Sequence, residues 1–203
     1  YIGEDDSRQS NELNYTVFNV VARGSYTWEN HTFSFGYERE ETEIFNLFVQ
    51  HTIGQYDFDS IADFRNGIPD DIDYNNAPSL NPTDAAADWS YASNALYAQD
   101  EWDLGNGVVV TAGLRYDFYP SDDTPAENAN FLASYGYSNA QSMDGRDLLQ
   151  PRLGVQWDVN DQLSLRGGFG LFSGGDPNVW LSNTYSTDFI SQFGVNEREF
   201  FNA

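Results

Sequence analysis

The sequence contains no cysteine and no lysine, and each absence argues against a class of function. Without cysteine there is no disulfide framework, no thiolate-bound zinc and no thiol nucleophile in these 203 residues. Without lysine, arginine supplies all nine basic side chains against 32 acidic ones, and the net charge is −23. A surface this acidic repels phosphate groups, which argues against nucleic acid as a partner.

Long apolar runs are missing as well. No stretch of about 18 apolar residues occurs, so no membrane-spanning helix is expected. The chain also opens without the basic and apolar regions of a signal peptide. Because Tyr1 does not look like a translation start, we expect the sequence to be an internal piece of a longer protein.

What the sequence does contain favours strands. Aromatic residues make up 16% of the chain, and Asp, Asn, Gly and Ser are frequent, which suits strands joined by polar turns and loops. Apolar and polar side chains alternate, as where Phe18, Val20 and Ala22 are interleaved with Asn19 and Arg23. The alternation predicts three hairpins, whose strands lie near residues 13–28, 31–50, 89–104, 107–119, 149–159 and 162–172.

The connections between these strands alternate in length. Short turns are expected near residues 29–30, 105–107 and 160–162, and long polar loops near residues 54–88, 120–148 and 173–203. A soluble meander has no reason to carry every long loop at one end, whereas outer-membrane barrels have short periplasmic turns and long external loops. The predicted fold class is therefore an all-β, antiparallel, up-and-down transmembrane β-barrel. Residues 1–203 would form a partial barrel domain without a plug, in contact with the lipid of a bacterial outer membrane.

Three tryptophans support the same orientation. Trp28, Trp102 and Trp157 each lie one to three residues before a short turn. Because indole prefers the membrane–water interface, these side chains are predicted to form an aromatic girdle at the periplasmic rim.

Charged side chains in mid-strand fall on the polar side of the alternation. In a water-filled lumen such charges can pair with one another. The residues predicted to face the lumen are Arg23, Arg115, Asp117, Arg152 and Arg166.

One strand departs from the pattern, because Asp100 shares a face with Leu96 and Trp102. Two explanations remain open from the sequence. Either Asp100 lies near the membrane interface, where a carboxylate costs little, or a bulge shifts the register of the strand.

Several stretches resemble the barrel of TonB-dependent receptors. They read NALYAQDEW at 94–102, TAGLRYD at 111–117, QPRLGV at 150–155 and LSLRGGFG at 163–170. With IFNLFVQ at 44–50, they are similar to the Oar-like subgroup, whose members carry an N-terminal carboxypeptidase-regulatory-like domain. The resemblance covers most of residues 13–180, and it is the order and spacing of the stretches that carries it, since each alone is degenerate.

The resemblance implies a barrel of about 22 strands, a plug domain inside it and a TonB box that engages the energy-transducing TonB complex. Neither the plug nor the TonB box is found in this sequence. The implied function is an outer-membrane receptor that binds a scarce extracellular ligand and imports it with TonB-supplied energy. The ligand could be a small molecule, a glycan or a peptide. A passive pore or structural barrel is the alternative, and a soluble acidic β-sandwich that acts as a binding module is the second.

Catalysis is not expected, because the two histidines, His31 and His51, fall at opposite ends of their strand and are interpreted as isolated polar side chains. No cofactor is expected either. The stretch from Asp71 to Asn76 begins like an EF-hand loop, but Asn76 replaces the required glycine and Pro82 the final glutamate. No metal site is therefore assigned, although a looser Ca²⁺ site in this loop stays open.

Acidic and aromatic side chains of the long loops are the candidates for meeting a ligand. They are Asp70, Asp71, Asp73, Tyr74, Trp89, Asp122, Asp123, Tyr135, Tyr137 and Trp180.

Overall fold

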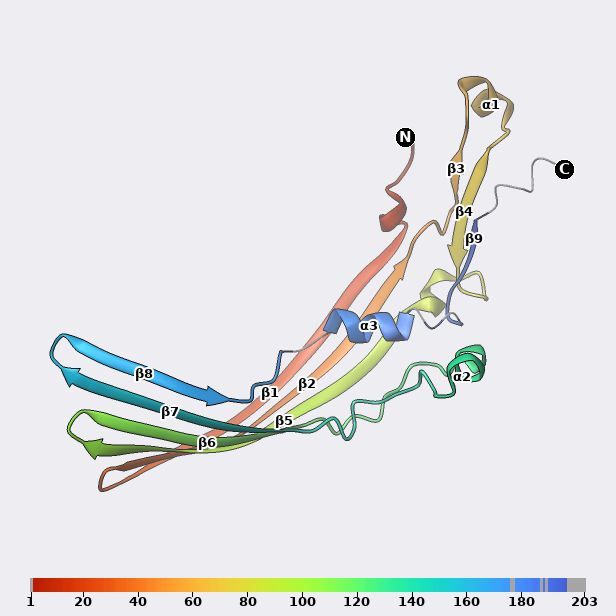
Figure 1. The fold of residues 1–203 in the computed structure, drawn as a ribbon. Helices are drawn as coiled ribbons and strands as arrows, with labels where there is room; N and C mark the ends of the chain where they lie inside the picture. Colours follow the sequence, from red (N-terminus) through yellow and green to blue (C-terminus); the bar gives the residue numbers. More distant parts are fainter. Residues whose placement is uncertain (1, 176–177, 187, 189, 197–203) are drawn as a thin grey trace.

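The computed structural model describes residues 2–175, 178–186, 188 and 190–196, and its main feature is a single curved antiparallel sheet (Figure 1). Six strands pair in the order β1-β2-β5-β6-β7-β8. Their bounds are β1 Ser10–Trp28, β2 His31–Val49, β5 Ala87–Gly105, β6 Val108–Phe118, β7 Leu148–Asn160 and β8 Leu163–Gly170. The predicted antiparallel fold with six neighbouring strands is confirmed, and the sheet is not closed.

Tight turns join the strands in pairs at one end of the sheet, here called the short-turn end. In the first hairpin Glu29 has a φ of 53°, and in the second Gly105, Asn106 and Gly107 have φ values of 77°, 52° and 75°. Such left-handed conformations match the twist of the flanking strands. Two features of Gly107 disfavour a side chain. Its φ is positive, and a Cβ there would lie 2.5 Å from the carbonyl oxygen of Asp158.

The opposite end, here called the long-loop end, is more ordered than the predicted polar loops. Residues 54–88 form β3 Gln55–Asp57, α1 Ile61–Asn66, β4 Asp71–Asn76 and the 3₁₀ turn η2 Pro82–Ala85. The other elements are η1 Asp6–Arg8, α2 Ala129–Tyr135, α3 Asn178–Ser186 and β9 Phe193–Asn196. A second sheet, β3-β4-β9, stands beyond the ends of the main strands (Figure 1). Of the loop expected at 173–203, residues 197–203 lie outside the described residues.

The main sheet has one apolar and one polar face, as the alternation predicts. Leu114 and Val155 of the apolar face are 48% and 42% exposed, and no second layer covers this part of the sheet in the described chain. In a β-sandwich both side chains would be buried between sheets, so the described chain does not have that arrangement. Among the described helices, none has the length and apolar character needed to cross a membrane.

The apolar character changes face towards the long-loop end. On the face that is polar near the short turns, Ile44, Trp89 and Tyr91 are buried. They are packed against Leu181 and Tyr185, which belong to α3. Helix α3 therefore folds back over β2 and β5, and the chain after β8 is attached to the sheet (Figure 1).

A second cluster lies on the opposite face of β2. Leu47 and Val49 are buried together with Ala77 and Ala85, which belong to the segment around η2. Both faces of β2 are thus covered by chain at the long-loop end, whereas neither face is covered in this way near the short turns.

The structure decides between the two explanations for Asp100. The pairing of β2 with β5 is regular from His31 opposite Trp102 onwards, and the register between β5 and β6 shifts only between Asp103 and Gly105. Asp100 therefore stays on the apolar face, and no bulge redirects it. Its Oδ2 lies 2.7 Å from Nδ1 of His31, so the interpretation of His31 as an isolated side chain is wrong. The imidazole also stacks on Trp102 with ring centroids 5.1 Å apart, so the polar pair lies within an aromatic cluster.

The turn at Gly107 gives a first testable prediction. Gly105→Ala and Gly107→Ala both place a Cβ in a left-handed conformation, which costs about 1 kcal/mol. Only the second variant also meets a backbone oxygen, because nothing lies within 4 Å of a Cβ at Gly105. We expect Gly107→Ala to lower the free energy of unfolding by at least about 1 kcal/mol more than Gly105→Ala. Urea unfolding of the protein in lipid vesicles measures both, and equal losses would contradict the structure.

Candidate functional site

The polar face carries a chain of ion pairs in mid-sheet. The Glu38 carboxylate, on β2, accepts hydrogen bonds from two guanidinium groups. Nη2 of Arg23, on β1, lies 2.7 Å from Oε1, and Nη1 of Arg115, on β6, lies 3.0 Å from Oε2. One carboxylate therefore connects strands that are not neighbours in the sheet.

Arg115 crosses the intervening strand β5 to make this contact. Glu38 and Asp117 are both register partners of Ala95, on either side of it. The small side chain of Ala95 is buried, and the guanidinium connects the two carboxylates across it, with Nε 2.7 Å from Oδ1 of Asp117. A larger side chain at this position would occupy the path of Arg115.

The network continues into β7 through a buried amide. The side-chain NH₂ of Gln150 donates to Asp117 Oδ2, and Gln150 is fully buried. Its oxygen accepts from Nη2 of Arg152 at 3.1 Å and from the backbone N–H of Ser173 at 2.9 Å. The Arg152 guanidinium also lies 4.6 Å from the ring centroid of Phe172. These contacts attach the chain after β8 to the polar face.

Four of the predicted lumen-facing residues are thus brought together: Arg23, Arg115, Asp117 and Arg152. Arg166 lies on the same face, opposite Gln156, and is exposed. The sequence analysis missed Glu38 and Gln150, which connect the cations and carboxylates. A signal for both was present in the sequence. Each lies at a position that the alternation assigns to the polar face, next to a strand with an arginine on the same face.

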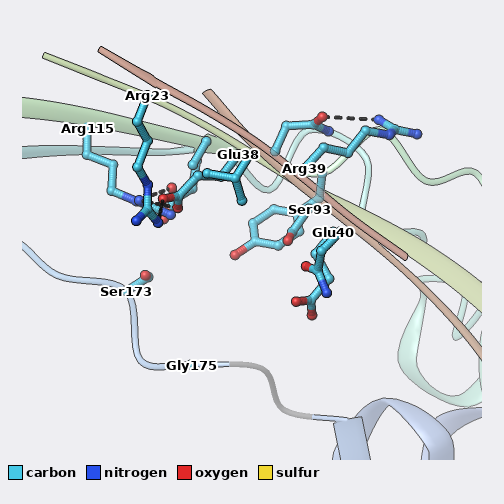
Figure 2. A pocket seen from close by; sticks show the side chains of 14 residues that line it. Arg23, Glu38, Arg39, Glu40, Ser93, Arg115, Ser173 and Gly175 are labelled. Atoms are coloured by element: carbon cyan, nitrogen blue, oxygen red, sulfur yellow. Dashed lines mark hydrogen bonds and ion pairs between the residues drawn. The ribbon is translucent and has the colours of Figure 1, made fainter. Parts of the chain in front are cut away.

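A hollow of about 380 Å³ lies over this network, between the sheet and the segment that contains Ser173 and Gly175 (Figure 2). Arg23, Glu38 and Arg115 line one side of it. Glu40 and Ser93 line it nearer to the long-loop end, and Figure 2 shows the Glu40 carboxylate pointing away from the arginine cluster.

The predicted ligand-facing loop residues do not form one site. Trp89 is only 3% exposed, because Tyr185 of α3 stacks on its ring with centroids 5.2 Å apart. The expectation that Trp89 faces a ligand is therefore wrong. Trp180, on α3, is exposed, and so are Tyr135 and Tyr137, which pack on Phe131 of α2.

Asp123 has a structural contact. Its Oδ2 accepts hydrogen bonds from the backbone N–H of Ser90 at 2.7 Å and from the Ser90 hydroxyl at 2.8 Å. These bonds hold the loop after β6 against the start of β5. Asp122, its neighbour, is exposed.

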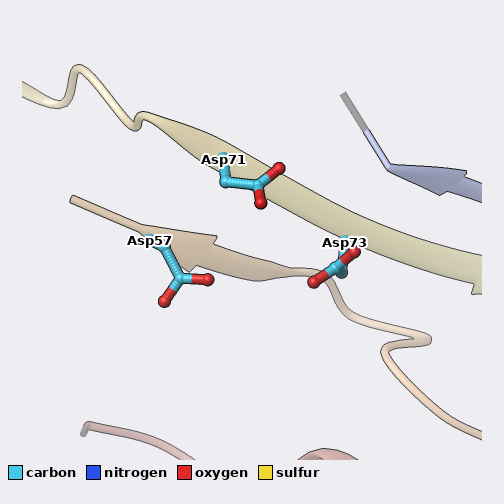
Figure 3. Close-up of side chains that lie close together, drawn as sticks. All are labelled: Asp57, Asp71 and Asp73. Atoms are coloured by element: carbon cyan, nitrogen blue, oxygen red, sulfur yellow. The ribbon is translucent and has the colours of Figure 1, made fainter. Parts of the chain in front are cut away.

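The acidic residues of β4 form a separate cluster. Asp57, Asp71 and Asp73 offer carboxylate oxygens within 4.8 Å of one another, on facing strands β3 and β4 (Figure 3). Asp71 is buried, and Asp73 accepts a hydrogen bond from the Asn196 side chain. Carboxylates suit Ca²⁺, but acidic side chains also gather on protein surfaces without an ion, so the geometry alone assigns no metal.

Their neighbours on β4 differ in exposure. Asp70 is exposed just before the strand, and the ring of Tyr74 lies 6.0 Å from that of Phe193, centroid to centroid. Tyr74 therefore helps to attach β9 to β4, and its ring is only partly accessible.

The three predicted girdle tryptophans lie on the apolar face at the short-turn end, and all are exposed. Trp28 and Trp102 are both register partners of His31. Trp102 pairs with Val110 of β6, and Trp157 pairs with Val108, two residues nearer to the turn. The rings therefore lie at nearly one height along the sheet.

The ion-pair network gives a second testable prediction. Arg115→Met would leave the carboxylates of Glu38 and buried Asp117 close together with one cation fewer. Removing one member of a buried pair costs about 3–5 kcal/mol, and the partial exposure of Arg115 reduces our expectation to about 2 kcal/mol. The exposed Arg166→Met is the control, with an expected change within about 0.5 kcal/mol. Urea unfolding in vesicles compares them, and equal losses would contradict a stabilising role for the network.

Tyr185 gives a third prediction. Burial against Trp89, with a contribution from the Asp123 charge, raises the pKa of Tyr185 to about 12. A raised pKa means that the folded state holds the phenol proton more tightly, so the stability from this group is complete below about pH 10 and is lost as the pH rises towards 12. Ultraviolet difference spectroscopy should show that Tyr185→Phe removes a late-titrating phenol. The exposed Tyr135→Phe is the control, and removal of the same late step by this variant would contradict the assignment.

Comparison with known proteins agrees with this geometry. The chain matches a family model described as an outer membrane beta barrel domain over residues 1–201. No curated protein and no solved structure gave a significant match. The family match extends over both the strands and the long-loop segments, and it is consistent with the exposed apolar face and the polar face with its ion pairs. The protein is accordingly located in the bacterial outer membrane, and the chain belongs to the outer membrane beta barrel domain family.

Proposed function

We propose that this protein is an outer-membrane receptor that binds a scarce extracellular ligand and imports it with energy supplied by the TonB complex. The apolar face would contact lipid, the polar face would line the lumen, and the short turns would lie in the periplasm. The role is binding and gated passage, without a bond-making step. The observation that carries the proposal is the open sheet: β1 and β8 do not pair with each other in the described chain.

The six strands of the open sheet do not close on themselves, which leaves room for a wide barrel. In a barrel of about eight strands the interior is filled by side chains, whereas barrels of about 22 strands enclose a lumen that is plugged in the outer-membrane transporters. Open strand edges are not stable in lipid, so β1 and β8 need further strands as neighbours. The resemblance of the strands to TonB-dependent receptors agrees with a barrel of the larger kind.

The long-loop end supports recognition of a ligand. Its segments carry helices, a second sheet and side-chain contacts to the barrel strands, such as that between Asn46 Nδ2 and Ser182 Oγ at 2.8 Å. Binding groups held on ordered elements lose less conformational entropy when a ligand arrives than groups on unstructured loops. A barrel that only filters by size does not need this order.

A passive pore is the second candidate, and the polar hollow above the arginine residues favours it. Rings or rows of charged side chains on an inner wall select ions in open channels. The two candidates differ in whether the lumen is closed at rest.

Conductance of the full-length protein in a planar lipid bilayer is our fourth prediction. A plugged receptor should conduct no ions until urea on the outer side displaces the plug, and it should close again when urea is removed. The purified protein should also bind the C-terminal domain of TonB. A steady open conductance without urea would instead support the passive pore, and silence in urea together with no TonB binding would support a structural barrel.

A further inference from the structure

One carboxylate on the polar face differs from its neighbours. Glu38 contacts two guanidinium groups, and Asp117 is bound by Arg115 and Gln150. Glu40, two residues further along the same face of β2, takes part in no ion pair or hydrogen bond within the described residues. It points into the space between the sheet and the segment that contains Ser173 and Gly175 (Figure 2).

The charged residues that line the hollow leave one carboxylate, that of Glu40, without a cationic partner. Among the charged residues that line the hollow, Arg23 and Arg115 balance Glu38 and Asp117, and Arg152, which continues the network, does not line it. Arg39 also borders the hollow, but its guanidinium is bound to Glu41 on the other face of β2. Glu40 adds one net negative charge at a place that a ligand could reach.

An apolar groove of about 260 Å³ begins at the same residue. Its sheet side is formed by Leu13, Tyr15 and Val17 of β1 with Ile44 of β2, and Val179 of α3 lies opposite. Leu13 and Tyr15 are 60% and 70% exposed, although they lie on the face that is polar nearer the short turns. Apolar surface of this extent on the inner side of a barrel is suited to covering by a ligand.

Among the described residues, Glu40 alone lines both the polar hollow and the apolar groove. Beside it Thr42 is buried in the groove wall, and its Oγ1 has no hydrogen-bond partner within the described chain. The polar hollow and the apolar groove therefore adjoin at the carboxylate of Glu40.

We propose that Glu40 and the groove of Leu13, Tyr15 and Val17 form a subsite for a ligand that carries an ammonium or guanidinium group on an apolar body. The cation would form a charge-assisted hydrogen bond with Glu40, and the body would cover the exposed side chains of β1. The net charge of −23 would raise the local concentration of such a ligand at the long-loop end. This inference rests on the proposed uptake function and narrows its ligand to cations.

Binding of phenethylamine tests the subsite, since it combines an ammonium group with an apolar ring. We expect the full-length protein in detergent to bind phenethylamine at least tenfold more tightly than the uncharged phenethyl alcohol, by titration with saturation-transfer NMR. Added salt should weaken only the amine. Glu40→Gln should lower amine affinity at least tenfold, to the level of the alcohol.

Glu43→Gln is the matched control, because Glu43 lies on the same strand, faces the other side and is exposed. It should leave the affinity for the amine within twofold of that of the unmodified protein. Val17→Asn should weaken both compounds several-fold without changing their ratio. Heat-modifiable gel migration verifies that each variant is folded. Equal affinity for amine and alcohol in the unmodified protein, or equal losses in Glu40→Gln and Glu43→Gln, would overturn the proposal.

The two proposals can fail separately. A protein that conducts steadily without urea but binds phenethylamine through Glu40 would refute active uptake and retain the subsite. A protein that stays closed and binds TonB but does not prefer the amine would retain active uptake and refute the subsite.

Discussion

The structure depends on the pairing register of the main sheet, because side chains alternate between the two faces with a period of two residues. A slip by one residue would move Arg115 to the lipid side and Leu114 to the water side. The pairing from β1 to β8 is continuous in mid-sheet, and within the described strands the register shifts lie beside the short turns, between Asp103 and Gly105 and between Asp158 and Asn160. The irregular positions therefore lie where backbone groups can reach water, and the pairing between neighbouring strands is regular in mid-sheet.

The same alternation serves two environments along one strand. Near the short turns the apolar side chains face outwards, as for Phe33 and Phe35 of β2. Further along β2, polar residues from Arg39 to Glu43 take over that face, while Ile44 is buried on the other side under α3. This change of face marks where contact with lipid ends and packing against the protein's own loops begins. The proposed cation subsite lies at this boundary, where the apolar side chains of β1 and the charged Glu40 of the polar face meet.

The sequence was sufficient for what is local. Strand positions, short turns and the polar face of Arg23, Arg115, Arg152 and Arg166 follow from alternation between neighbouring residues, and the pairing of the strands agrees with them. The burial of Trp89 could not be predicted, since α3 arrives from nearly 90 residues further along the chain. The elements within the long loops were missed although one had a readable signal. Ser60 caps α1 with Asp63 in the first turn, and Gly67 ends the helix in a left-handed conformation, the pattern expected of a short helix.

The absence of lysine has a structural counterpart in the ion-pair network. Arg115 uses two different nitrogens, Nε towards Asp117 and Nη1 towards Glu38, to bind carboxylates on strands β6 and β2. A guanidinium has several donors in one rigid plane, so it can hold both partners across Ala95, whereas an ammonium group is a compact point charge. Buried Asp117 in turn needs the second donor from Gln150, because a carboxylate removed from water requires its lone pairs to be satisfied. Arg115 and Gln150 therefore connect neighbouring and next-neighbouring strands, and the small side chain of Ala95 makes the path of Arg115 possible. Glu40 lies on the same polar face, where its carboxylate is accessible to the proposed ligand.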